Sequence, residues 1–70
     1  MYKAIFKEGN SRTIEIGKFD DKESAIDACV KYKMGHFSCD TPQERRIGLT
    51  ERGWAIIGYT NYEVSIEEES

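Results

Sequence analysis

The sequence has few of the residues that metal sites, disulfide frameworks and catalytic centres require. Its 70 residues include one histidine, one proline and two cysteines. Zinc sites use paired Cys or His ligands at two short spacings. The only local cluster of such residues is His36, Cys39 and Asp40, with Cys29 distant in the sequence. We therefore expect no metal and no cofactor.

The same scarcity argues against an enzyme. His36 and Cys39 could form a nucleophile–base pair, but a working site also needs oxyanion donors and a substrate cleft, which the sequence does not indicate. A disulfide between Cys29 and Cys39 is not expected either, because nothing marks the chain as secreted and cytosolic thiols stay reduced. Catalytic, cofactor-binding and metal-binding residues are therefore all predicted to be absent.

Long apolar runs are also absent. No run approaches the roughly 20 residues that a membrane-spanning helix needs. The chain opens on a strand-like pattern at 2–7 and lacks the apolar stretch of a signal peptide. We expect a cytoplasmic protein that does not contact a membrane.

The N-terminal half contains a clear hairpin and helix. Residues 2–7 and 12–18 alternate apolar and polar side chains around a Gly-Asn turn, which predicts two antiparallel strands. Residues 21–34 repeat apolar side chains at helical spacing, with Asp20 as the expected N-cap and Glu23 three residues later.

The C-terminal half is harder to interpret. Residues 44–50 read as a strand with Ile47 and Leu49 inward, followed by a turn at Gly53. The stretch 54–66 is either one long bent strand or two strands that turn at Thr60-Asn61, and the single strand is slightly favoured. The tail 67–70 is expected to be frayed.

These patterns predict one α+β domain over residues 1–66. Its antiparallel sheet has four strands, or five in the second layout, with one helix on one face and the element order β-β-α-β-β. The predicted core consists of Ala4, Phe6, Ile14, Ile16, Ala25, Ile26, Cys29, Val30, Ile47, Leu49, Trp54, Ile56 and Val64.

The apolar stretch that starts at Trp54 is the best functional signal. It is apolar on both faces, and a domain this short has little interior to hide two such faces. If Trp54 faces the helix, then alternate residues form an outer patch that binds another protein or a second copy of the chain. A bend of the strand or a loop would be the alternative cover for this surface. The predicted partner-binding residues are Ile5, Ile57 and Tyr59, rimmed by Lys3, Lys7 and Arg46.

Nucleic acid is the alternative partner. Basic residues and aromatic rings of the predicted sheet could contact phosphates and stack on bases. Against this, the formal net charge is −3 and residues 54–70 contain no basic side chain.

The hairpin that leads into Phe19-Asp-Asp-Lys-Glu-Ser-Ala-Ile-Asp-Ala-Cys, followed by a second predicted hairpin with a tryptophan, resembles small ββαββ domains. In size and layout the chain also resembles small inhibitors encoded by phages or mobile elements, such as anti-CRISPR proteins. No specific motif carries this resemblance, so no functional residues are transferred. It implies a non-enzymatic inhibitor that blocks the surface of another protein.

Overall fold

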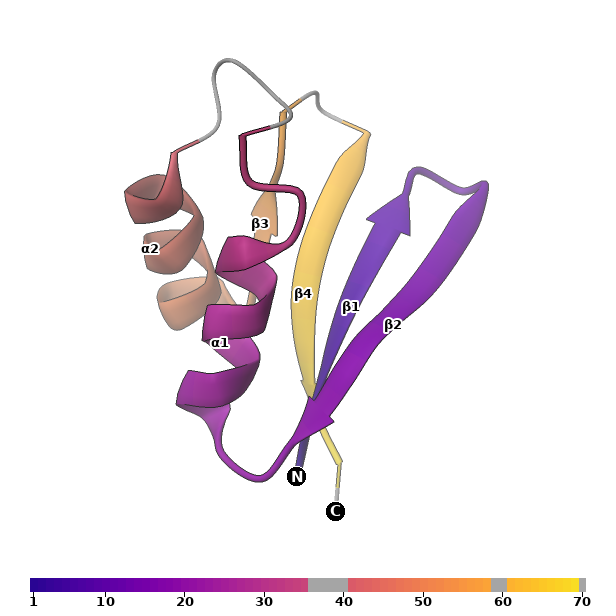
Figure 1. Cartoon of the computed structure of the whole chain (residues 1–70). Coiled ribbons are helices and arrows are strands. Elements are labelled where there is room, and N and C mark those ends of the chain that lie inside the picture. Colours follow the sequence, from indigo (N-terminus) through magenta and orange to yellow (C-terminus); the bar gives the residue numbers. More distant parts are fainter. Residues whose placement is uncertain (36–40, 59–60, 70) are drawn as a thin grey trace.

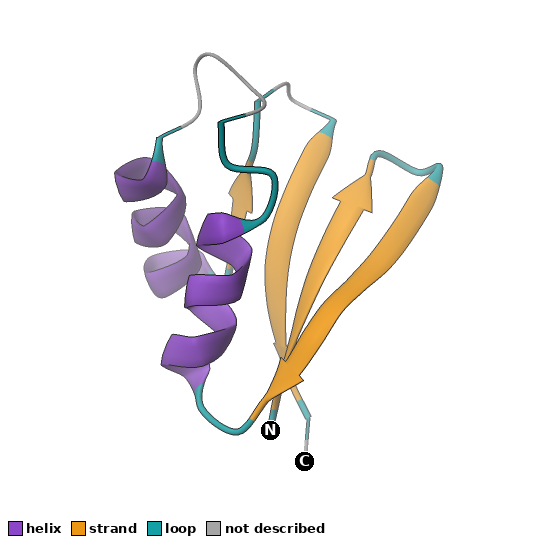
Figure 2. Ribbon diagram, viewed as in Figure 1, coloured by secondary structure: helices purple, strands orange, loops and turns teal. Residues whose placement is uncertain are grey.

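The computed structural model describes residues 1–35, 41–58 and 61–69. Four strands form one antiparallel sheet in the order β2-β1-β4-β3, and two helices pack on one of its faces (Figures 1 and 2). The predicted α+β class and four-stranded antiparallel sheet are confirmed, whereas the prediction of a single helix is wrong. The elements are β1 (Tyr2–Glu8), β2 (Arg12–Phe19), α1 (Lys22–Lys31), α2 (Pro42–Arg52), β3 (Trp54–Ile56) and β4 (Tyr62–Glu68).

The N-terminal hairpin forms as the sequence predicts. β1 pairs antiparallel with β2, and Gly9 adopts a φ of 57° in the turn between them. The register shifts between Ala4 and Ile5, so that Ile16 is an extra residue in β2. A bulge of this kind bends the strand and increases its twist.

Helix α1 begins one residue later than predicted. Asp21, rather than Asp20, is the N-cap, and its carboxylate accepts a hydrogen bond from the Ser24 N–H at 2.7 Å. This hydrogen bond lowers the pKa of the Asp21 carboxyl. The apolar stripe of the helix is buried as expected, and the helix ends at Lys31 instead of residue 34.

The predicted strand at 44–50 is instead part of helix α2. Thr41 caps its N-terminus by accepting from the Glu44 N–H, and Pro42 occupies the first turn, where its missing N–H costs nothing. Gly53 ends the helix with a φ of 87°, a left-handed conformation that glycine adopts without strain. These caps were stronger signals than the Ile47-x-Leu49 alternation that favoured a strand.

The stretch 54–66 contains two strands rather than one long strand. β3 ends at Ile56, and β4 returns antiparallel to it from Tyr62. β4 also pairs with β1 along its whole length, which places it in the centre of the sheet. The residues Glu67 and Glu68, expected to be frayed, belong to β4, and the Glu69 N–H donates to the Met1 carbonyl.

The core lies between the sheet and the two helices. Of the predicted core residues, Ile47, Trp54 and Ile56 are exposed. Ala55 and Ile57, which were not predicted to lie in the core, are buried. The predicted alternation of inward and outward side chains at β3 was therefore shifted by one residue. Such a shift moves every side chain of a strand to the other face of the sheet. The buried cluster consists of Ala4, Phe6, Ile26, Cys29, Val30, Leu49, Ala55, Ile57 and Val64, with Ile14 and Ile16 packed against it.

A buried arginine joins the two helices. Arg45 of α2 is only 1% exposed, and its guanidinium donates to the carbonyls of Cys29, Val30 and Tyr32 at 2.6 to 3.0 Å. These carbonyls lie at the C-terminal end of α1, where the last carbonyl groups of a helix have no N–H partner within the helix. Burial lowers the pKa of the Arg45 guanidinium.

Candidate interaction surface

The sheet face opposite the helices is covered mainly by charged side chains. In β1, Lys3, Ile5 and Lys7 point to this open face, since Ala4 and Phe6 between them belong to the core. Lys7 lies opposite Glu63 of β4 and Lys3 opposite Glu67. Basic β1 therefore runs beside acidic β4.

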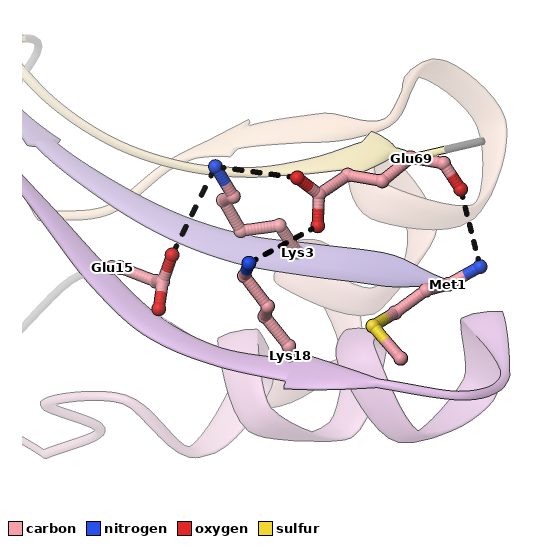
Figure 3. A network of polar contacts seen from close by, with 5 residues as sticks. All are labelled: Met1, Lys3, Glu15, Lys18 and Glu69. Carbon is pink, nitrogen blue, oxygen red and sulfur yellow. Dashed lines mark hydrogen bonds and ion pairs between the residues drawn. The ribbon is translucent and has the colours of Figure 1, made fainter.

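Ion pairs link the two ends of the chain on this face (Figure 3). The Lys3 ammonium lies 3.8 Å from the Glu15 carboxylate and 3.6 Å from that of Glu69, and Lys18 lies 3.8 Å from Glu69. The terminal amine of Met1 donates to the Glu69 carbonyl at 3.3 Å. Beneath these charges Ile5 is only 5% exposed, so the long side chains of the face cover it.

Large apolar side chains of the sheet are exposed at Met1, which is 56% exposed, and at the β3 end. Trp54 and Ile56 are 40% and 42% exposed, and their partners in β4, Ser65 and Glu63, point to the open face. The Arg52 guanidinium lies 4.4 Å from the centre of the Trp54 ring, within the range of a cation–π contact. We call Arg52, Trp54 and Ile56 the β3 patch.

Two glycines position this patch. A side chain at Gly48 would come within 3.0 Å of the Trp54 carbonyl and 3.2 Å of Ala55, so only glycine lets α2 approach β3 this closely. Gly53 reverses the chain from α2 into β3. Because Ala55 is anchored against α2, Trp54 and Ile56 must point to the other face.

A second exposed apolar side chain lies on α2. Ile47 is 56% exposed and lines a shallow depression on the outer side of the helix. Arg46 beside it forms an ion pair of 2.6 Å with Asp27 of α1. Apart from Ile47, the depression is lined by Gln43, Arg46, Thr50 and Glu51.

The structure does not bring the predicted partner-binding residues together. Ile5 is buried under the open face, whereas Ile57 is fully buried on the opposite, helix-covered side. Tyr59 lies outside the described residues. Lys3 and Lys7 lie on the open face, but Arg46 lies on α2 in its ion pair with Asp27.

The candidate metal and catalytic residues His36, Cys39 and Asp40 also lie outside the described residues. Within the described ranges, no three His, Cys, Asp or Glu side chains are grouped as metal ligands would be. Cys29 is fully buried, and its thiol donates to the Ser65 carbonyl at 3.5 Å. Burial raises the pKa of this thiol to about 11, which keeps it protonated and unreactive.

Neither helix of the described structure is long and apolar enough to span a bilayer. Comparison with known proteins finds no match: no family model fits the sequence, and no curated protein or solved structure is detectably similar to the chain. A function for this chain must therefore be inferred from the side chains on its surface.

In the apolar stretch that starts at Trp54, the structure exposes Trp54 and Ile56 and buries Ile57, the reverse of the predicted arrangement. The signal in the sequence is Thr41-Pro42 together with Gly53, because these residues mark the two ends of α2, the helix that packs on β3. The face of this three-residue strand is decided by Gly48 and the packing of Ala55, which periodicity alone does not show.

Proposed function

We propose that this chain is a non-catalytic protein-interaction module that binds a partner protein through the β3 patch. The observation that carries the proposal is the exposure of Trp54 and Ile56 together on a sheet whose remaining open face is covered mainly by charged side chains. Trp and Arg are the residue types most enriched among binding hot spots. A tryptophan that is held in place by a stacked arginine loses little further freedom on binding.

The proposed mode of action is to block the surface of the partner. The β3 patch is built on a strand anchored to α2 and β4, so it is formed before binding. A small preformed patch can occupy a site on another protein without chemistry of its own. This role agrees with the resemblance to small phage-encoded inhibitors, and the partner itself is to be identified by experiment.

Nucleic acid receives less support as the partner. Lys3, Lys18, Arg12 and Arg46 each lie within 4 Å of a carboxylate, and Arg45 is buried. Binding to phosphates depends on basic side chains that are free to replace counterions. Four of the ten basic side chains are therefore paired with a carboxylate, and a fifth is withdrawn from the surface.

The proposal is tested by capture with paired variants. The wild-type chain is immobilised on a resin and incubated with a host-cell lysate, and the captured protein is identified and purified. Its affinity for wild type, Trp54→Ala and Ile47→Ala is then measured by calorimetry. We expect Trp54→Ala to weaken binding by roughly 30-fold, the loss of about 2 kcal/mol typical of a hot spot. Ile47→Ala removes an even more exposed apolar side chain outside the β3 patch and should leave the affinity within about twofold.

Circular dichroism first establishes that both variants fold. Equal affinities of wild type and Trp54→Ala for the captured protein would refute the proposal. So would selective retention of nucleic acid that falls steeply with salt, because that result belongs to the alternative partner.

A further inference from the structure

Strand β2 forms the edge of the sheet opposite β3. It is eight residues long, against three in β3, and in the described part of the chain no other element lies on its outer side (Figure 1). An edge strand presents unpaired backbone groups that can pair with another strand. At β3 the Trp54 carbonyl is already approached by Gly48 and Arg52 of α2. The longer and uncovered edge is therefore β2.

The hydrogen bonds of the sheet identify the backbone groups at this edge. Met1 and Glu69 exchange hydrogen bonds between β1 and β4, so alternate residues of β1 from Met1 onward bond to β4. The intervening residues of β1 then bond to β2. The residues of β2 opposite Lys3, Ile5 and Lys7 therefore direct their N–H and C=O groups outward, and these are Lys18, Glu15 and Thr13.

The bulge changes which side chains of β2 lie on the same face of the sheet. Because Ile16 is an extra residue, Glu15 and Lys18 lie on the same open face although they are three positions apart. Ile14 and Phe19 lie together on the helix side, where both are only partly buried. Without the bulge, spacings of three residues for the first pair and five for the second would place the members of each pair on opposite faces.

We propose that two copies of the chain pair through β2, antiparallel, with Glu15 opposite Lys18 of the second copy. The two-fold axis then makes two such ion pairs on the open face. The same register places Ile14 opposite Phe19 of the second copy on the helix side, and Ile16 opposite Gly17. The outward backbone groups of Glu15 and Lys18 meet each other, as a hydrogen-bonded pair requires.

Charge selects this register over its neighbours. A register centred on Glu15 sets two carboxylates opposite each other, and one centred on Lys18 sets two ammonium groups opposite each other. Side chains of Glu15 and Lys18 are about half exposed, at 50% and 49%, and therefore accessible to a second copy. The Phe19 ring lies over Gly17, within 3.1 Å of a Cβ placed there, so the apolar row at this edge is continuous.

The dimer adds to the proposed function without depending on it. It forms one eight-stranded sheet whose two outer ends are the β3 edges, so each dimer presents two β3 patches. Two patches on one body allow bivalent binding to a partner that carries two sites.

Cysteine variants test the register directly. In a Cys39→Ser background, Glu15→Cys and Lys18→Cys chains are oxidised separately and as a mixture. Opposed hydrogen-bonded residues have Cα atoms about 5.5 Å apart, within reach of a disulfide. Two copies of the same residue lie three positions apart in this register, or about 10 Å, which is too far. We expect disulfide-linked dimers only in the mixture.

Light scattering over a concentration series tests the association itself. We expect a monomer–dimer equilibrium, with a dissociation constant raised roughly tenfold by Glu15→Lys and restored by Glu15→Lys/Lys18→Glu. Trp54→Ala should leave this equilibrium unchanged, so the proposed dimer and the proposed binding function of the β3 patch can be refuted independently. A chain that stays monomeric up to millimolar concentration, or cross-linking of either cysteine variant alone, would overturn the proposed pairing.

Discussion

The two faces of this sheet differ in how their side chains are covered: helices bury one face, and charged side chains cover most of the other. On the helix side, Phe6, Val64 and Ile57 are almost completely buried beneath α1 and α2. On the open side, charged residues of β1 and β4 cover Ile5 and Ser65, and none of the described helices or strands lies over them. A domain this small buries a limited share of its surface, and here the core takes the helix side while long charged side chains cover the second face.

The contrast is sharpest at the β3 end. There the open face has no lysine in register with Trp54 or Ile56, so their apolar surface stays exposed. A substitution on the helix side should therefore change the stability of the fold. A substitution at the β3 patch should mainly change binding.

The largest effect on stability is expected from Arg45, which lies between the helices. Arg45→Ala removes the donors to three carbonyls at the end of α1 and leaves buried acceptors unpaired. The expected loss in the free energy of unfolding is about 3–5 kcal/mol. Urea denaturation followed by circular dichroism measures it.

Arg46→Ala is the matched control for that change, because it removes the neighbouring arginine from an exposed ion pair with Asp27. Its expected cost is below about 1 kcal/mol. Similar losses for the two arginines would show that the buried contacts do not stabilise the helix pair.

The next effect compares two apolar residues of α2. Leu49 is fully buried on the helix side of the sheet, and Leu49→Ala should lower the free energy of unfolding by about 2–5 kcal/mol. Ile47 lies on the outer side of the same helix, and Ile47→Ala should change it by less than about 0.5 kcal/mol. Chemical denaturation of both variants tests whether this segment is helix α2 or the strand that the sequence alone suggested. That strand would bury both residues, so both substitutions would then be costly.

Cys29 makes the stability of the covered side depend on pH. Its pKa is raised from 9.0 to about 11 in the folded chain, so the unfolded thiol ionises first as the pH rises. The contribution of the neutral thiol is complete below pH 9 and is lost between pH 9 and about 11. We expect a loss of about 2–3 kcal/mol over this window.

Denaturation curves of wild type and Cys29→Ala, recorded at several pH values, isolate this effect from the titration of lysines and tyrosines. The difference in unfolding free energy between the two proteins should shrink across the window. A difference that stays constant with pH would mean that the thiol is not desolvated.

The smallest effect is expected from Ser65, which points to the open face next to Val64 on the covered face. The Ser65 hydroxyl is buried and has no hydrogen-bond partner in the described structure. Ser65→Ala should therefore be neutral or stabilise the fold by up to about 1 kcal/mol. Val64→Ala, one residue earlier, should destabilise it by about 1.5–3 kcal/mol. Thermal unfolding of both variants tests whether adjacent residues differ in this way.

The sequence predicted the parts of the fold that local signals specify. The hairpin has its Gly9 turn and regular alternation, and α1 has an acidic cap and a helical stripe, so both were predicted nearly in place. The error at α2 came from giving the alternation of Ile47 and Leu49 more weight than Pro42 and Gly53. Short apolar runs fit a strand and a helix equally well, and the capping residues then decide.

The candidate site was predictable only as a segment. An apolar stretch after Gly53 was recognised from composition, but the exposed members turned out to be Trp54 and Ile56. Arg45 gave no sequence signal at all, because a buried arginine and a surface arginine look the same until the carbonyls that it contacts are placed.

The sequence by itself determined the α+β class, the first hairpin and the position of α1, since each depends on neighbouring residues. The tertiary structure decided which face of β3 is exposed, where Arg45 binds and which edge of the sheet is open. Those features arise where α2 packs on β3 and against the end of α1, so they depend on contacts between segments that are distant in the chain.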